Sequence, residues 1–141
     1  MGGGLIIEIL EKSPEAVSCL QSLILQPQLD IPEVRRYIHK IGFAISKESM
    51  ITDAGKFYNV IVCEPGEELG YSEAEYLLGR NPLERKSDVF IEYLVKRLEE
   101  LRKIESNIQK SSGNLDTDGR KRLMEVRRLI EIFEGCYYER R

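Results

Sequence analysis

Residues 23–43 read LILQPQLDIPEVRRYIHKIGF, and this stretch decides the fold that the sequence predicts. LIL at 23–25 is a brief apolar run with no alternation, ended by a proline, which is typical of a strand buried on both faces. DIPE at 30–33 has an N-cap residue, a first-turn proline and an acidic residue in order. The helix that follows, 34–41, is expected to stop at Gly42. The stretch therefore predicts a strand followed by a helix.

Two β-rich runs come next along the chain. Residues 43–51 and 56–63 are joined by TDAG at 52–55, a turn-forming cluster, which predicts an antiparallel hairpin. The second run carries apolar side chains at both alternating sets of positions, so we expect it to be a central strand covered on both faces.

Ahead of the strand predicted at 23–25, the chain begins MGGGLIIEIL at 1–10. Its apolar residues have helical spacing over 5–12. SPE at 13–15 either breaks that helix or starts a second segment. Glycines ahead of a helix commonly let the backbone turn sharply out of a strand and approach a ligand. No strand precedes them here. The glycines are therefore either a flexible start or the second half of a strand, turn and helix.

The character of the sequence changes after the sheet region. A short helix is predicted over 71–78, with a break at 79–82. Two amphipathic helices on either side of SSGN at 111–114 then predict an antiparallel, coiled-coil-like hairpin with a mutual hydrophobic seam. The expected organisation is a partial sheet domain at 1–66, a connecting helix and loop at 67–86, and the helical hairpin at 87–141. Only three strands are expected in the sheet, so we expect its beginning to lie outside this segment.

Composition limits the classes of protein that the chain can belong to. With 42% apolar residues in 141 and no long apolar run, the sequence predicts a soluble, cytoplasmic protein without membrane association. The net charge of -3 means that any nucleic-acid binding must come from a local patch. Cys19, Cys63 and Cys136 are far apart and fit reduced thiols, so no metal site or disulfide is predicted. His39 is expected to be a surface residue.

Four strings in register carry a resemblance to a known family: MGGGLIIEIL at 1–10, LILQPQLDIPEVRRYIHKIGF at 23–43, ITDAGKFYNVIVCEPG at 51–66 and LLGRNPLERKSDVFIEYL at 77–94. Together they resemble the bacterial TrmK family of class I, S-adenosylmethionine-dependent methyltransferases, which methylate N1 of adenosine 22 in tRNA. The resemblance implies an α/β fold: the C-terminal half of a Rossmann-like methyltransferase sheet followed by an antiparallel coiled-coil helical hairpin.

The same resemblance implies what the segment lacks. Family members carry a Gly-rich loop and an acidic residue that hold S-adenosylmethionine, ahead of the part matched here, and this sequence has no GxGxxG motif. We therefore expect a C-terminal portion of a methyltransferase that lacks the N-terminal cofactor-binding half and is inactive alone. The alternative is a non-enzymatic interaction or oligomerisation module built on the hairpin, with helical self-association.

The resemblance also places the cofactor-facing residues. Ligands of open α/β sheets gather at the carboxyl ends of strands. The turn after the family's fourth strand corresponds to Met1, Gly2 and Gly3, and the end of the next strand corresponds to Gln26 and Pro27. These five are the candidate residues for binding S-adenosylmethionine. Gln26 either hydrogen-bonds an adenine edge or caps the strand end. No catalytic residue is assigned.

Candidate RNA-binding residues come from the predicted hairpin. The family's coiled-coil domain resembles this hairpin and is thought to help hold tRNA. The candidate cations are Arg120, Lys121, Arg127 and Arg128 on the second helix, and Lys96 and Arg97 on the first. Glutamates lie between them, so a solvated face with ion pairs along each helix stays an equal alternative.

Overall fold

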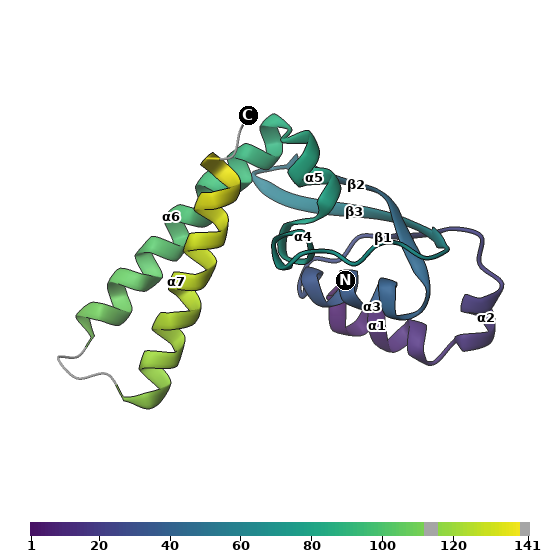
Figure 1. Cartoon of the computed structure of the whole chain (residues 1–141), viewed down its shortest axis with the longest axis horizontal. Helices are drawn as coiled ribbons and strands as arrows, with labels where there is room; N and C mark the ends of the chain where they lie inside the picture. Colours follow the sequence, from purple (N-terminus) through teal and green to yellow (C-terminus); the bar gives the residue numbers. More distant parts are fainter. Residues whose placement is uncertain (112–115, 139–141) are drawn as a thin grey trace. The chain divides into compact units, whose positions relative to one another are not determined.

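The structure is a computed structural model that describes residues 1–111 and 116–138. It divides into two compact units, Met1–Arg85, here called the sheet unit, and Lys86–Arg141, here called the hairpin unit (Figure 1). The sheet unit contains α1 (Gly3–Glu11), α2 (Pro14–Ser18), β1 (Leu23–Leu25), α3 (Ile31–Lys40), β2 (Phe43–Asp53), β3 (Lys56–Pro65), α4 (Glu73–Leu78) and α5 (Arg80–Arg85). Among the described residues no helix is both long and apolar enough to cross a membrane.

The sheet has the order β1-β3-β2, and both outer strands run antiparallel to β3. The predicted hairpin is confirmed: its turn has positive φ at Ala54 (50°) and Gly55 (78°), as a two-residue hairpin turn requires. The central position predicted for the second β-rich run is confirmed as well. Its inward positions, Asn59, Ile61 and Cys63, are buried, and the alternate positions are only half-buried.

The core lies on one face of this sheet, beneath α1 and α3 (Figure 1). Its buried members are Ile6, Leu10, Leu25, Val34, Ile38, Phe43, Ile45, Ile61, Cys63 and Tyr71. The prediction that residues 23–25 are buried on both faces is wrong, because Ile24 is 68% exposed while Leu25 is buried. The reason is that β1 is an outer strand in the described chain and is covered by helices on the core side alone.

A β-bulge in β2 changes which side chains enter the core. The register passes from Ile45 opposite Cys63 directly to Lys47 opposite Val62, so Ser46 is the extra residue. Simple alternation from the buried Ile45 would turn Lys47 inward. Because of the bulge, Lys47 is exposed and Glu48 is buried instead. A carboxylate therefore faces the interior of the unit.

The start and end of α3 differ in how well they match the sequence. Gly42 has φ 81° just after the helix, so the predicted stop is confirmed. Asp30 occupies the N-cap position but has left-handed φ (56°), and its side chain makes no capping hydrogen bond. The predicted capping role of Asp30 is therefore wrong, although α3 begins at Ile31, directly after it.

The segment after the sheet contains two short helices. Ser72 and Glu75 form a capping box that starts α4, and Gly79 ends it with φ 92°. The predicted break at residues 79–82 is wrong beyond Gly79, because α5 begins at Arg80. Pro82 is tolerated there since it lies in the first turn, where its missing N–H is not needed.

The hairpin unit consists of α6 (Asp88–Lys110) and α7 (Thr117–Tyr138), which lie side by side in Figure 1. Glu105 contacts Arg127, and Arg102, three residues earlier, contacts Glu134, seven residues later, so the helices run antiparallel as predicted. Residues 112–115 of the predicted turn lie outside the described residues. The buried seam comprises Phe90, Leu94, Leu98, Leu101 and Ile108 of α6 and Val126, Phe133 and Cys136 of α7.

Candidate functional site

The first residues of the chain lie beside the segment that leaves β1, and the two run parallel. The N–H of Gln28 donates to the carbonyl of Met1 (2.9 Å), and the N–H of Gly3 donates to the carbonyl of Leu29 (2.8 Å). These bonds form an isolated parallel bridge between Gly2 and Leu29. We call residues 1–3 and 26–30 the strand-end corner. It brings together the two segments that the sequence placed at a cofactor site.

Gly3 is the tightest point of this corner. A Cβ at Gly3 would lie 2.5 Å from the carbonyl oxygen of Leu29, 2.7 Å from that of Asp30 and 2.9 Å from Cγ2 of Val34. Two of these neighbours are backbone atoms and cannot rotate away. A Cβ at Gly4, in contrast, would meet no atom within 4 Å. The close approach of α1 to the end of β1 therefore requires glycine at position 3 and not at position 4.

The five candidate cofactor residues differ in accessibility. Met1 is 56% exposed, the Gln26 side chain is exposed, and Gly2 is half-buried. Gly3 and Pro27 are buried. Met1, Gly2 and Gln26 are thus the members that a ligand at this corner can reach. Among the described residues, no group of three His, Cys, Asp or Glu side chains could hold a metal ion.

An apolar groove runs from the corner along β1, here called the edge groove. It has a volume of about 400 Å³ and is lined by Met1, Ile6, Ile9, Leu10, Leu23, Ile24, Leu25 and Gln26. Within the described chain, β1 pairs only with β3, so its second edge has no strand beside it. Ile9 (47% exposed) and Ile24 (68%) therefore present apolar surface next to unpaired backbone.

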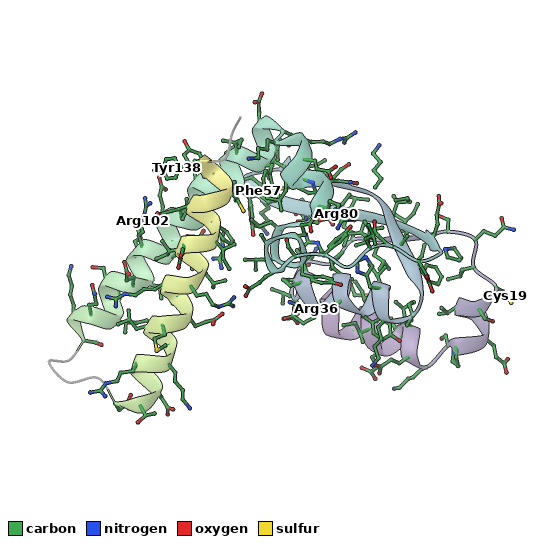
Figure 2. All side chains as sticks on the ribbon, in the orientation of Figure 1. Cys19, Arg36, Phe57, Arg80, Arg102 and Tyr138 are labelled. Atoms are coloured by element: carbon green, nitrogen blue, oxygen red, sulfur yellow. The ribbon has the colours of Figure 1, made fainter. Side chains whose placement is uncertain are left out.

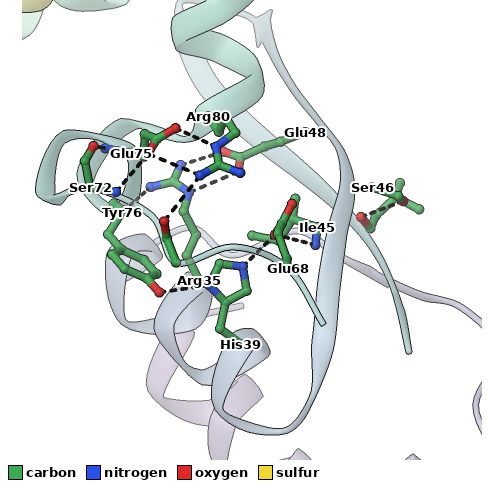
Figure 3. A network of polar contacts seen from close by, with 12 residues as sticks. Arg35, His39, Ile45, Ser46, Glu48, Glu68, Ser72, Glu75, Tyr76 and Arg80 are labelled. Atoms are coloured by element: carbon green, nitrogen blue, oxygen red, sulfur yellow. Dashed lines mark hydrogen bonds and ion pairs between the residues drawn. The ribbon is translucent and has the colours of Figure 1, made fainter. Parts of the chain in front are cut away.

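A buried ion pair joins α3 to β2 in another part of the sheet unit (Figure 3). Arg35 and Glu48 are each 1% exposed. Nε and Nη2 of Arg35 donate to the two carboxylate oxygens of Glu48 (3.0 and 2.5 Å), and Nη1 donates to the carbonyl of Tyr76 (2.7 Å). Asn59 also donates to Glu48 (2.9 Å). This complete set of partners makes the buried charges tolerable.

His39 extends the same network, and its predicted surface location is wrong. Its Nδ1 lies 2.8 Å from the Tyr76 hydroxyl, and its Nε2 lies 2.6 Å from Oε1 of Glu68. Glu68 also accepts the N–H of Ile45 (3.0 Å). These contacts tie the segment after β3 to α3 and β2. Every partner of His39 and Arg35 comes from a distant part of the chain, so local pattern gave no signal for them.

The candidate RNA-binding cations fall into two groups on the hairpin. Arg97 pairs with Glu100 (2.8 Å), Arg127 with Glu105 (3.0 Å) and Arg128 with Glu125 (2.7 Å). Arg120 and Lys121 are exposed and form no ion pair within the described part of the chain. Lys96 is exposed. The structure therefore separates arginines that already have a carboxylate partner from the two cations at the start of α7.

The three cysteines are free, and their surroundings predict very different reactivity. Cys19 is exposed at the end of α2 (Figure 2), whereas Cys63 and Cys136 are buried. Burial raises the pKa of the Cys63 thiol to about 12, so almost no reactive thiolate exists there at mildly alkaline pH.

We expect iodoacetamide to label the native protein at Cys19 alone and to label all three thiols in urea, as measured by the intact mass of the protein. The Cys19→Ser variant should remain unlabelled while folded; labelling of Cys63 as fast as Cys19 would contradict the burial.

Comparison with known proteins gives one family and several relatives. A family model described as TrmK, tRNA (adenine(22)-N(1))-methyltransferase, matches residues 1–134. The tRNA (adenine(22)-N(1))-methyltransferase of Bacillus subtilis (strain 168) is 30% identical over 140 residues, which are 95% of this chain and 58% of that protein. The chain thus spans less than two thirds of the length of this curated relative.

Solved structures agree with the fold. A protein of the NADB-Rossmann superfamily from Streptococcus agalactiae has a TM-score of 0.85 and 21% identity, covering 97% of this chain and 56% of that one. Streptococcus pneumoniae Sp1610 in complex with S-adenosyl-L-methionine has a TM-score of 0.82 and 27% identity, with 97% and 56% covered. The predicted α/β fold related to Rossmann-like methyltransferases is therefore confirmed.

Proposed function

Because the chain belongs to the TrmK family of tRNA (adenine(22)-N(1))-methyltransferases, we propose that it forms the C-terminal part of an enzyme that methylates N1 of adenosine 22 in tRNA. The methyl donor is S-adenosylmethionine, as its family membership suggests. The observation that carries the proposal is the strand-end corner, where Met1 to Gly3 and Gln26 to Leu29 meet in parallel register. Ligands of open α/β sheets bind at such strand ends.

The corner fits one wall of a cofactor and base site. Met1, Gly2 and Gln26 are accessible there, while Gly3 and Pro27 hold the backbone in place. S-adenosylmethionine supplies the electrophilic methyl group when bound. Adenine N1 already has a lone pair, so the principal task of the protein is to align the two reacting atoms. The Gln26 amide can donate and accept hydrogen bonds, which suits an adenine edge.

The remaining walls require polypeptide equivalent to the part of the relatives that this chain does not span. The edge groove supports this proposal, because it offers an unpaired strand edge flanked by Ile9 and Ile24. A strand that runs parallel to β1, in register with the bridge at Gly2, would pair with this edge and cover Ile9 and Ile24. Full burial of a large apolar side chain contributes about 1.5–3 kcal/mol, so this cover would be favourable. Alone, the chain should bind S-adenosylmethionine weakly and should not turn over.

Calorimetric titration with S-adenosylmethionine tests the proposal. We expect no measurable binding by the 141-residue chain and micromolar binding after it is co-expressed with the N-terminal part of the B. subtilis relative. The matched control is that relative, split at the equivalent position and reassembled. Micromolar binding by the chain alone would contradict the proposal. So would a failure of the folded, reassembled hybrid to bind when the split control does.

The rival function, an interaction module that self-associates through the hairpin, has less support. Its apolar seam is already buried between α6 and α7, as the low exposure of Leu94 and Phe133 shows. A helical module that assembles through such a seam needs an uncovered apolar stripe. Among the described residues of the hairpin, the exposed large apolar side chains are only Val95, Met124 and Tyr138.

A further inference from the structure

The ion pairs of the hairpin are unevenly distributed along its length. Two of them cross between the helices: Arg102 to Glu134 (2.7 Å) and Arg127 to Glu105 (3.0 Å). Each of the other two lies within a single helix: Arg97 pairs with Glu100 in α6, and Arg128 pairs with Glu125 in α7. Beyond Glu105 on α6 and ahead of Glu125 on α7, the described residues form no such pair. The arginines in the body of the hairpin are thus paired with carboxylates, whereas the cations at its end have no ion-pair partner among the described residues.

Four cations gather at that end. Since Glu105 faces Arg127 in an antiparallel pair, Lys110 lies at the level of Arg122, five residues along each helix. Arg120 and Lys121 precede it on α7. All four are exposed, and none has an ion-pair partner among the described residues. We call Lys110, Arg120, Lys121 and Arg122 the tip cluster.

Acidic residues do not cancel this charge. Between positions 110 and 122 the four cations stand against two aspartates, Asp116 and Asp118. Asp116 already accepts the backbone N–H of Gly119 (2.7 Å) at the start of α7. The tip is therefore locally positive in a chain whose net charge is -3. Such a local patch is what attraction to a polyanion needs when the whole-molecule charge opposes it.

Free cations are better suited than paired ones to bind phosphate. To bind phosphate, a paired arginine must either break its ion pair with the carboxylate or bring that negative charge close to the phosphate. Either one reduces the binding free energy. A free lysine or arginine releases only water and counterions condensed on the nucleic acid. Met124, 71% exposed, lies one turn beyond Arg120 and Lys121. It adds an apolar contact next to the charges, which a ribose or an unstacked base can cover.

We propose that the tip cluster is a tRNA phosphate-binding site, and that Arg97, Arg127 and Arg128 are structural cations that contribute little to RNA affinity. This inference rests on the proposed function for its choice of RNA. The 22-residue α7 is ~33 Å long, so contacts at the tip are far from the other end of the hairpin.

Two triple variants of the full chain separate the groups of cations. The tip variant is Arg120→Gln, Lys121→Gln and Arg122→Gln, and the control is Arg97→Gln, Arg127→Gln and Arg128→Gln. Each removes three positive charges and keeps good helix formers. The probe is a fluorescently labelled, unmodified tRNA transcript, and its Kd is measured by anisotropy from about 50 to 200 mM salt. Circular dichroism checks that both variants keep their helices.

We expect the tip variant to bind about tenfold or more weakly, with the slope of log affinity against log salt flattened by about two. The control should change by less than about threefold, since exposed pairs carry little net charge. The proposal is overturned if the two variants lose equal affinity, or if the tip variant binds like the parent. It is also overturned if the parent does not bind at about 50 mM salt, or if duplex DNA of equal phosphate content competes equally.

A kinetic readout separates this inference from the proposed function. In the hybrid completed with the B. subtilis part, the tip variant should raise the KM for tRNA and leave kcat unchanged, because phosphate contacts made equally before and during methyl transfer contribute to binding alone. An unchanged KM would refute the tip site while methyl transfer still supports the proposed function. Absence of methyl transfer in the parent hybrid would instead count against the proposed function itself.

Discussion

Replacing Glu48 with leucine is expected to lower the free energy of unfolding by about 3–5 kcal/mol, because it breaks a buried ion pair on one side. The Arg35 guanidinium is 1% exposed and donates twice to the Glu48 carboxylate. Without that carboxylate it keeps one partner, the Tyr76 carbonyl, and Asn59 loses the acceptor for its amide. An uncompensated buried charge, rather than the lost attraction, is the main source of the expected effect.

Urea unfolding followed by circular dichroism measures this change. The matched control is Glu100→Leu, which breaks the Arg97 pair whose side chains are 38% and 48% exposed. We expect a loss of no more than about 1 kcal/mol in the control. The double variant Arg35→Met with Glu48→Leu should be more stable than Glu48→Leu alone, since no lone charge remains buried. Equal losses for Glu48→Leu and Glu100→Leu would show that the buried pair is not as the structure describes it.

The second large effect is expected at the strand-end corner. Gly3→Ala should destabilise the chain by about 3 kcal/mol, at the upper end of the usual cost of overpacking. The added methyl group would be placed 2.5 and 2.7 Å from two backbone oxygens, so α1 must move away from the end of β1. That movement also strains the hydrogen bond from the Gly3 N–H to Leu29.

The neighbouring glycine provides the control for this prediction. Gly4 also lies in α1, but a methyl group there meets nothing within 4 Å. Gly4→Ala should therefore stabilise the chain by about 0.5–1 kcal/mol, through helix propensity alone. Thermal or urea unfolding of both variants gives the comparison. Two alanine variants that shift stability in the same direction would contradict the close approach at Gly3.

Local sequence signals accounted for the elements that they specify directly. The cluster at 52–55 fixed the hairpin, because a turn with two positive φ angles needs residues such as Gly55. Gly42 ended α3 for the same kind of reason. Helical periodicity was enough to predict α6 and α7, since each helix buries one stripe of apolar side chains against the other helix. In these places the sequence and the tertiary structure impose the same requirement.

The interior polar network could not be predicted in the same way. Glu48 is turned inward by the bulge at Ser46, and no pattern in residues 43–51 marks that extra residue. Arg35 can be buried only because Glu48 and the Tyr76 carbonyl, 13 and 41 residues away, supply its partners. Asn59, a polar residue in the inward alternation with Ile61 and Cys63, was the one available hint of a buried polar partner.

The candidate sites also combine features that the sequence predicted with features that depend on tertiary contacts. Sequence resemblance pointed to both segments of the strand-end corner, and the structure places those segments side by side. Periodicity overestimated the cover of β1, because an apolar run such as 23–25 does not reveal whether both faces are covered within the same chain. The division of hairpin cations into paired and free groups depends on contacts such as Arg127 to Glu105 between the helices. Composition alone could not provide it.

The most direct test of the central claim is methyl transfer by the completed protein. The hybrid of this chain with the N-terminal part of the B. subtilis relative is incubated with tRNA and labelled S-adenosylmethionine, and N1-methyladenosine is quantified by mass spectrometry of the digested RNA. We predict one methyl group per tRNA with the hybrid, none with the chain alone, and none on a tRNA whose target adenosine is replaced by guanosine. No N1-methyladenosine from a folded hybrid, while the split B. subtilis control is active, would contradict the claim.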